Sequence, residues 1–322
     1  MSRPGRQELR TLLLGAVSSS LVSTSSIRSI TADDGTRIEY TVQGTGPALV
    51  LSNGLTTTHL FWKYLEPRWL EHYTVLKWDL PGHGTSSPAA SERSATIEGQ
   101  PDLLAHVMDD AGIEHAVQVG FSVGCQVALE MARQYPRRCD AMVLLLGGAG
   151  NVLSTTRLPL PAPLLSRVLR DTPDNVFAPL ARGFARLATQ EISYQAGRVF
   201  GMLGPKAPRR DIQEMMEHML SVDPATIRRM AVSAEAHSAL DVLASLQEAQ
   251  VPVLIVAGDL DPFAPATEVG ERMHRAAPAS EFVLIEGGTH TALLEQPEQI
   301  AEIVEDFLTR HGITAVHRPL SG

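Results

Sequence analysis

The chain has 322 residues, of which 44% are hydrophobic and 20% charged, a composition typical of a globular protein with a sizeable core. Its formal net charge of -9 provides no basic stripe for a phosphate backbone, so no nucleic-acid partner is expected. The two cysteines, Cys125 and Cys139, are too few for a disulfide framework or a cysteine metal site. This cysteine usage favours a reducing, cytoplasmic setting.

The first residues combine arginines with a short apolar patch, Leu12 to Val17, which partly matches a secretory signal peptide. Glu8 and the serines from Ser18 onward disfavour such a signal, so secretion is the weaker alternative. We expect residues 1–25 to form a loosely ordered extension and residues 313–322 a C-terminal tail. No apolar run is long enough to span a membrane, so stable membrane insertion is not expected. The sequence does not indicate an oligomeric state.

Short apolar runs predict the strands of a sheet. They are residues 36–42, 48–52, 73–78, 116–120, 142–146, 251–257 and 281–285. Most of these runs are continuously apolar rather than alternating, which is typical of parallel strands buried on both faces. Helical patterns lie between many of them. This alternation predicts an α/β fold with an open, doubly wound, mostly parallel sheet.

The stretch from residue 150 to residue 246 interrupts this alternation because it contains no convincing buried strand. It holds a proline-rich stretch at 157–165 and amphipathic helical patterns at 175–188 and 211–220. We therefore expect residues 150–246 to be a helical cap. The cap is inserted between the two parts of one core, which are residues 26–149 and 247–312.

The segment Gly120-Phe121-Ser122-Val123-Gly124 places a serine between two glycines, where a predicted strand gives way to a predicted helix. Glycines leave room for a tight, strained turn and for a close crossing of helix and strand. The segment therefore matches the G-x-S-x-G pattern of a nucleophile elbow. An ordinary strand-to-helix connection that happens to contain a serine is the alternative, so the interpretation depends on partners elsewhere in the chain.

A serine hydroxyl is a weak nucleophile and needs a base, together with a third group that orients the base. His290 lies in a loop directly after the last predicted strand, and Asp259 and Asp261 follow the preceding predicted strand. Asp261 lies further into its loop and can reach a histidine more easily, whereas Asp259 is suited to hold the turn through its own hydrogen bonds. We therefore predict that Ser122, Asp261 and His290 are the catalytic residues.

The order serine, aspartate, histidine along the chain resembles that of the α/β-hydrolase superfamily, in particular esterases, lipases and haloperoxidase-like members with a helical cap. The resemblance covers roughly residues 30–310. It implies an α/β-hydrolase fold and acyl transfer through an acyl-enzyme, with no metal or organic cofactor. The segment 78–87, with Asp79 and His83, resembles the family's turn beside the nucleophile, where a structural role is expected.

The resemblance also implies an oxyanion hole built from backbone N–H groups. This chain has Asn53-Gly54-Leu55 where the family commonly has His-Gly followed by an apolar residue. The first donor is therefore expected to be Leu55, with Thr56 as the alternative. The second donor is expected to be Val123, the residue after the nucleophile.

Taken together, the resemblance implies hydrolysis of a small-molecule carboxylic ester, and the apolar content of residues 150–246 favours a small or medium apolar substrate. A carbon–carbon bond hydrolase or a peracid-forming relative would use the same residues. A ligand-sensing protein of the same fold without turnover is an alternative of another class. A relative with an aspartate nucleophile is excluded if Ser122 occupies the elbow. Cys125 is expected to pack in the core rather than to act as a catalytic thiol.

Overall fold

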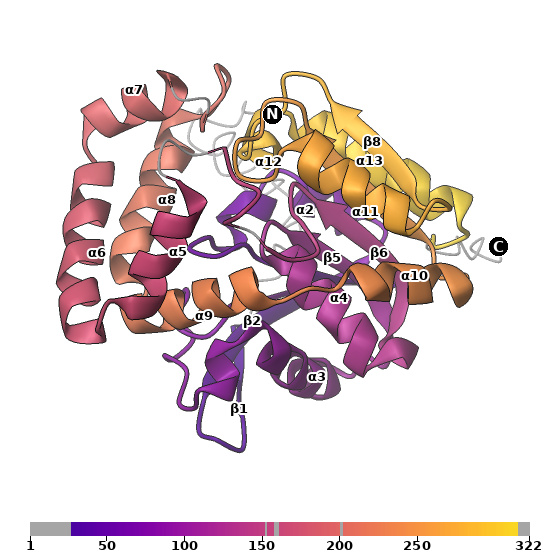
Figure 1. Cartoon of the computed structure of the whole chain (residues 1–322). Helices are drawn as coiled ribbons and strands as arrows, with labels where there is room; N and C mark the ends of the chain where they lie inside the picture. Colours follow the sequence, from indigo (N-terminus) through magenta and orange to yellow (C-terminus); the bar gives the residue numbers. More distant parts are fainter. Residues whose placement is uncertain (1–26, 152, 158–160, 200–201, 315–322) are drawn as a thin grey trace, which may run out of the picture.

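One eight-stranded sheet forms the centre of the computed structural model, which describes residues 27–314 except 152, 158–160 and 200–201 (Figure 1). The extension expected at 1–25 and most of the tail expected at 313–322 lie outside the described residues. The strands are β1 (Arg28–Thr31), β2 (Arg37–Gly44), β3 (Ala48–Ser52), β4 (Thr74–Trp78), β5 (Ala116–Phe121), β6 (Cys139–Leu145), β7 (Val253–Gly258) and β8 (Glu281–Ile285).

The sheet is mostly parallel, which confirms the fold predicted from the sequence. Its strand order is β1-β2-β4-β3-β5-β6-β7-β8, and β3 to β8 pair in parallel. At one edge, β2 pairs antiparallel with both β1 and β4. Strand β1 is not predicted from the sequence, because this four-residue edge strand alternates between partly buried and exposed side chains and has no continuous apolar run.

Helices cover both faces of the sheet. The α-helices are α2 (Glu66–Trp69), α3 (Gln100–Ala111), α4 (Gly124–Gln134), α5 (Ala162–Asp171), α6 (Asp174–Ala188), α7 (Glu191–Val199), α8 (Arg209–Ser221), α9 (Pro224–Ala236), α10 (Leu240–Glu248), α11 (Glu271–Ala276), α12 (Ala292–Glu295) and α13 (Pro297–Arg310). Short helical turns are η1 (His59–Trp62), η2 (Arg93–Ala95), η3 (Ile97–Gly99), η4 (Pro136–Arg138) and η5 (Ala266–Gly270).

The inner strands β3, β6 and β7 send side chains alternately into two hydrophobic cores, one on each face of the sheet. The first core includes side chains of α3, α4, α10 and α11, and the second includes those of α2, α12 and α13. Leu49 and Val50 are consecutive residues of β3 and belong to opposite cores, as do Met142 and Val143 of β6. Burial on both faces explains why the strands are continuously apolar, and it stabilises the fold by about 25 cal/mol per Å² of apolar surface removed from water.

Helices α5 to α9 follow β6 in the sequence and gather beside the sheet, on the left of Figure 1. Helix α6 packs against α8 and α9, and α5 packs against α9. Helix α10 begins at Leu240, within the range expected for the cap, but it packs against α4 and α11 and contributes to the first core. In the described ranges, no helix is both long enough and apolar enough to cross a membrane.

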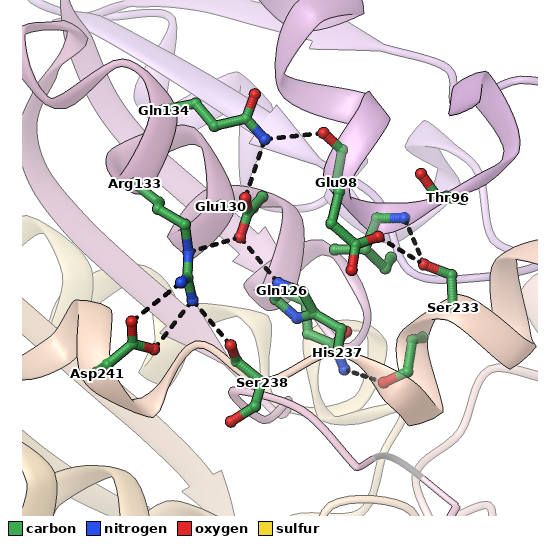
Figure 2. A network of polar contacts seen from close by, with 12 residues as sticks. Thr96, Glu98, Gln126, Glu130, Arg133, Gln134, Ser233, His237, Ser238 and Asp241 are labelled. Atoms are coloured by element: carbon green, nitrogen blue, oxygen red, sulfur yellow. Dashed lines mark hydrogen bonds and ion pairs between the residues drawn. The ribbon is translucent and has the colours of Figure 1, made fainter.

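A polar network with the buried Glu130 and His237 at its centre links the end of α9 to α4 (Figure 2). The Glu130 carboxylate in α4 lies 2.9 Å from His237 Nε2 and 2.9 Å from Arg133 Nε. Arg133 also donates hydrogen bonds to the Asp241 carboxylate and to the Ser238 carbonyl oxygen. Burial raises the pKa of Glu130, but the hydrogen bond with His237 and the Arg133 charge outweigh it and lower the pKa below its ordinary value. The network therefore keeps the Glu130 carboxylate ionised at the point where the chain passes from α9 to α10.

Glu130→Ala is expected to lower the free energy of unfolding by about 3 kcal/mol, because it leaves His237 and Arg133 without their buried carboxylate. Asp241→Ala removes another partner of Arg133 but one whose side chain is 67% exposed, so its loss should stay below about 1 kcal/mol. Urea unfolding of both variants measures the difference. Equal losses would show that burial does not determine the strength of this network.

Candidate active site

Ser122, Asp261 and His290 lie together at the carboxyl edge of the sheet. Ser122 Oγ lies 3.0 Å from His290 Nε2, and His290 Nδ1 lies 2.8 Å from Asp261 Oδ2. Ser122 follows β5, Asp261 follows β7 and His290 follows β8, and the carboxyl ends of these parallel strands meet at one edge. The structure thus brings all three predicted residues into one line of contacts.

The backbone of Ser122 occupies a sharp turn between β5 and α4. Its φ of 55° lies in the left-handed region, which is uncommon for a residue other than glycine. A Cβ on Gly120 would lie 2.4 Å from the Gly124 carbonyl oxygen, and a Cβ on Gly124 would lie 2.1 Å from the Ser52 carbonyl oxygen. Only glycine permits these approaches. Helix α4 begins at Gly124, so the positive end of its dipole lies next to the serine.

Asp261 is held in place by the turn that it belongs to. Its buried carboxylate accepts hydrogen bonds at Oδ1 from the N–H groups of Phe263, at 2.8 Å, and Ala264, at 3.0 Å, which leaves Oδ2 for His290. The expectation that Asp259 holds this turn is wrong. The Asp259 side chain is exposed and forms no hydrogen bond with the residues that the structure describes.

Two aromatic rings flank the His290 imidazole. The centroids of the Phe121 and Phe263 rings lie 5.2 and 4.9 Å from that of His290, whose side chain is 17% exposed. Because the Asp261 carboxylate accepts from Nδ1–H, the other nitrogen, Nε2, is left free to accept a proton from the serine. Phe263 follows Asp261 and Pro262 in the same loop, and no sequence pattern indicates its contact with His290.

The loop after β3 passes directly beside the serine. A Cβ on Gly54 would lie 3.0 Å from Ser122 Cβ. The Thr56 N–H donates to His83 Nε2 at 2.9 Å, whereas the N–H groups of Leu55 and Val123 have no acceptor within the described part of the chain. An N–H group that is already bonded inside the protein is not free for a bound oxyanion. Of the two alternatives that the sequence leaves open, the geometry therefore favours Leu55.

His83 binds the loop after β3 at Thr56. It is fully buried, and its Nδ1 lies 3.0 Å from the Pro81 carbonyl oxygen, so Nδ1 donates and Nε2 accepts from Thr56. Burial lowers the pKa of His83, which keeps the ring neutral and preserves this acceptor. The structural role expected for this turn therefore includes a bond to Thr56, which the sequence pattern does not predict.

His218 of α8 lies next to His83, with 6.4 Å between the ring centroids, and burial lowers its pKa to about 4. A histidine of the unfolded chain binds a proton near pH 6.5, so between about pH 6.5 and pH 4 the unfolded chain binds more protons than the folded chain. The free energy of unfolding is therefore expected to fall as the pH is lowered through this range. His218→Gln should reduce this slope by up to roughly 1 kcal/mol per pH unit, measured by urea unfolding.

The exposed His72 provides the matched control for this measurement. His72→Gln removes a histidine that is not buried, so its slope should equal that of the wild type. A His218→Gln slope that also equals the wild-type slope would contradict the predicted effect of burial.

A reactive cysteine and a metal site are the two remaining kinds of reactive group to consider. Cys125 is buried, its Sγ lies 3.3 Å from the Gly120 carbonyl oxygen, and burial raises its pKa, which disfavours a reactive thiolate. Within residues 27–314, apart from the undescribed gaps, no group of three or more His, Cys, Asp or Glu side chains is arranged to hold a metal ion.

The mostly parallel sheet, the serine on its strand-to-helix turn and the hydrogen bonds through His290 to Asp261 define an enzyme of the hydrolase class. The family model described as alpha/beta hydrolase fold matches residues 47–297. The chain therefore belongs to the α/β-hydrolase family, as the resemblance implied.

Known proteins are similar over most of the chain. A 2-hydroxy-6-oxononadienedioate/2-hydroxy-6-oxononatrienedioate hydrolase from Burkholderia vietnamiensis is 29% identical over 287 residues, which cover 86% of this chain and 93% of the relative. A pimeloyl-(acyl-carrier protein) methyl ester esterase from Aeromonas hydrophila is 24% identical over 268 residues, which cover 82% and 96%. A thermophilic esterase structure from Thermogutta terrifontis has a TM-score of 0.67 at 24% identity and covers 89% of this chain and 99% of that chain, which shows a shared fold.

Proposed function

We propose that this chain hydrolyses a carboxylic ester, or a related carbonyl substrate, through an acyl-enzyme on Ser122. The observation that supports this most strongly is the line of contacts from Ser122 Oγ through His290 to Asp261, at 3.0 and 2.8 Å. A hydroxyl that is bonded to a neutral imidazole can lose its proton as it attacks a carbonyl carbon. A carboxylate behind the imidazole stabilises the imidazolium that forms.

In the proposed first step, Ser122 Oγ bonds to the carbonyl carbon while its proton moves to His290 Nε2. The imidazolium then gives this proton to the departing alkoxide, which leaves as an alcohol, and the acyl group stays on the serine. In the second step, His290 takes a proton from water, and the resulting hydroxide attacks the acyl carbon. The acid leaves, and Ser122 regains its proton from His290. No metal or organic cofactor takes part in these steps.

Negative charge develops on the carbonyl oxygen in both steps, and the N–H groups of Leu55 and Val123 are the proposed donors to it. Both N–H groups lack another acceptor among the described residues, and Val123 directly follows the nucleophile. A preorganised donor of this kind stabilises the transition state by about 3 kcal/mol. Because the donors are backbone groups, the Asn53 that replaces the family's common histidine does not remove them.

Residues 150–246 are proposed to act as a cap over this site. Asp211, at the start of α8, accepts a hydrogen bond from the Tyr64 hydroxyl at 2.7 Å, and the Gly204 N–H donates to Glu295 at 3.0 Å. Tyr64 follows the loop with the oxyanion donors, and Glu295 follows the loop with the histidine. These contacts support a cap that touches both sides of the site.

A small or medium apolar substrate is proposed from the side chains that surround the reacting groups. Phe121 and Phe263 are both apolar, and their rings flank His290. Such surroundings favour an apolar acyl group and exclude water from the reacting carbonyl. The similarity to a methyl ester esterase supports an ester as the reacting group.

A carbon–carbon bond hydrolase with the same residues is the second candidate, with peracid formation as a variant of it. The observation that favours it is the 29% identity to a hydrolase whose name specifies an oxo-dicarboxylate rather than an ester. A ligand-sensing protein would keep the same fold and serine without turnover.

The test uses p-nitrophenyl esters from acetate to dodecanoate together with charged and sugar esters. In parallel it uses a fluorophosphonate probe whose attachment site is found by peptide mass. We expect nitrophenolate release that is fastest for short to medium acyl chains, and a label on Ser122. A label on Ser122 without turnover of any ester would favour the second candidate or ligand sensing. Turnover restricted to charged or sugar esters would contradict the apolar substrate, and a protein that is neither labelled nor active would contradict the proposed nucleophile.

A further inference from the structure

Glu295, the last residue of α12, collects three hydrogen bonds on a single carboxylate oxygen. Its Oε1 accepts from the Thr289 hydroxyl at 2.8 Å, from the Thr291 hydroxyl, and from the Gly204 N–H at 3.0 Å. The two threonines are the neighbours of His290 in the chain. Gly204 belongs to the connection between α7 and α8, far from His290 in the sequence. One oxygen atom therefore contacts both the histidine loop, residues 289–291, and the helical segment, which is α5 to α9 with their connections.

The threonine contacts restrict where the histidine can lie. Thr289 and Thr291 are 2% and 4% exposed, so their hydroxyls need partners inside the protein. The Thr291 N–H also donates to Thr289 Oγ1 at 3.2 Å, which ties the two sides of the histidine together. The imidazole of His290 can meet Ser122 Oγ only if this loop is held, and a misplacement of about 1 Å can lower the rate about 100-fold.

We propose that Glu295 is a positioning residue that couples the order of the His290 loop to the docking of the helical segment at Gly204. The proposal rests on the proposed function, because it gives His290 the role of the base. Glu295 does not touch the reacting atoms. It acts by holding Thr289 and Thr291, and it does so most firmly when the Gly204 N–H also binds to Oε1.

Two substitutions of Glu295 can separate the effect of its hydrogen bonds from the effect of its charge. All three end on Oε1, and Oε2 has no hydrogen-bond partner among the residues described. Glutamine retains an oxygen at the position of Oε1, so Glu295→Gln can retain every one of these bonds while it removes the charge. Glu295→Ala removes the charge and the bonds together.

Gly204 allows the same carboxylate to be disturbed from the side of the helical segment. A Cβ on Gly204 would lie 1.9 Å from Glu295 Oε2, so Gly204→Ala must push the carboxylate aside. The matched control is Gly183→Ala in α6, because a Cβ on Gly183 would meet no atom within 4 Å.

The first readout is kcat and KM for the best ester of the panel. Glu295→Ala is expected to lower kcat at least about tenfold with KM within about twofold, whereas Glu295→Gln should stay within about threefold of the wild-type kcat. Gly204→Ala should also lower kcat. It should cause no further loss in the Glu295→Ala background, because the group that it displaces is already absent. Gly183→Ala should leave both constants unchanged.

The second readout is amide hydrogen exchange of the intact chain, which does not depend on turnover. Glu295→Ala and Gly204→Ala should accelerate exchange in the peptides that contain Gly204 and residues 289–291, and Glu295→Gln should not. If Ser122→Ala leaves ester turnover unchanged, the proposed function fails, and this exchange measurement still tests the coupling. Equal losses of kcat in Glu295→Gln and Glu295→Ala, additive losses in the double variant, or unchanged exchange at Gly204 in Glu295→Ala would each overturn the proposal.

Discussion

Ser122→Ala is expected to lower kcat for the best ester by about 10⁵-fold, with little change in KM. Alanine has no oxygen that could form the acyl-enzyme, while His290 and the two proposed backbone donors remain in place. Those groups alone assist the direct attack of water only weakly. Steady-state kinetics measure the loss, and the fluorophosphonate label should disappear from the peptide that contains residue 122.

Cys125→Ala is the matched control because Cys125 is a nucleophilic side chain on the first turn of α4, close to the serine. The thiol is buried and its pKa is raised, so it is not expected to react. We expect Cys125→Ala to keep kcat within about threefold of the wild type, although it removes a packed side chain from the core. If the two variants lost activity equally, Ser122 could not be distinguished as the nucleophile.

The sheet could be predicted from the sequence because its signals are local. Each buried strand is a short apolar run, and burial on both faces makes these runs continuous, as in β5 and β7. The positions of Ser122, Asp261 and His290 follow from the same signals, because each residue lies on the turn or loop that follows a strand of the sheet. The carboxyl ends of parallel strands meet at one edge, so the topology alone brings these residues near one another.

Contacts between distant segments could not be predicted in this way. The bond from Thr56 to His83, which favours Leu55 as the oxyanion donor, joins residues that are 27 positions apart, and the bond from Gly204 to Glu295 spans 91 positions. An amphipathic pattern indicates that a helix forms and which of its faces is apolar, but not which loop the helix will contact. The sequence also does not show which side chains of a loop are exposed. The hydrogen bonds expected for Asp259 are therefore formed by Asp261 instead.

Asp261→Asn is expected to lower kcat by about 10⁴-fold. Asparagine can keep an oxygen at the position of Oδ1, which accepts from the N–H groups of Phe263 and Ala264, so the turn should keep its shape. The group that faces His290 Nδ1 then becomes an amide NH₂, which donates rather than accepts. The imidazole must turn Nδ1 into an acceptor and carry its proton on Nε2, so it can no longer take the proton of Ser122.

Asp259→Asn separates this effect from a general loss of negative charge at the sheet edge. It makes the same chemical change two residues away, on a side chain that is exposed, so kcat should stay within about twofold of the wild type. Thermal unfolding of both variants should give midpoints close to that of the wild type, because neither substitution removes a buried contact of the turn. With folding unchanged, a loss confined to Asp261→Asn arises from the carboxylate beside His290, which sets the tautomer of the imidazole and stabilises its charged form. Equal losses in the two variants would instead indicate that the charge of the loop, rather than the bond to Nδ1, supports the histidine.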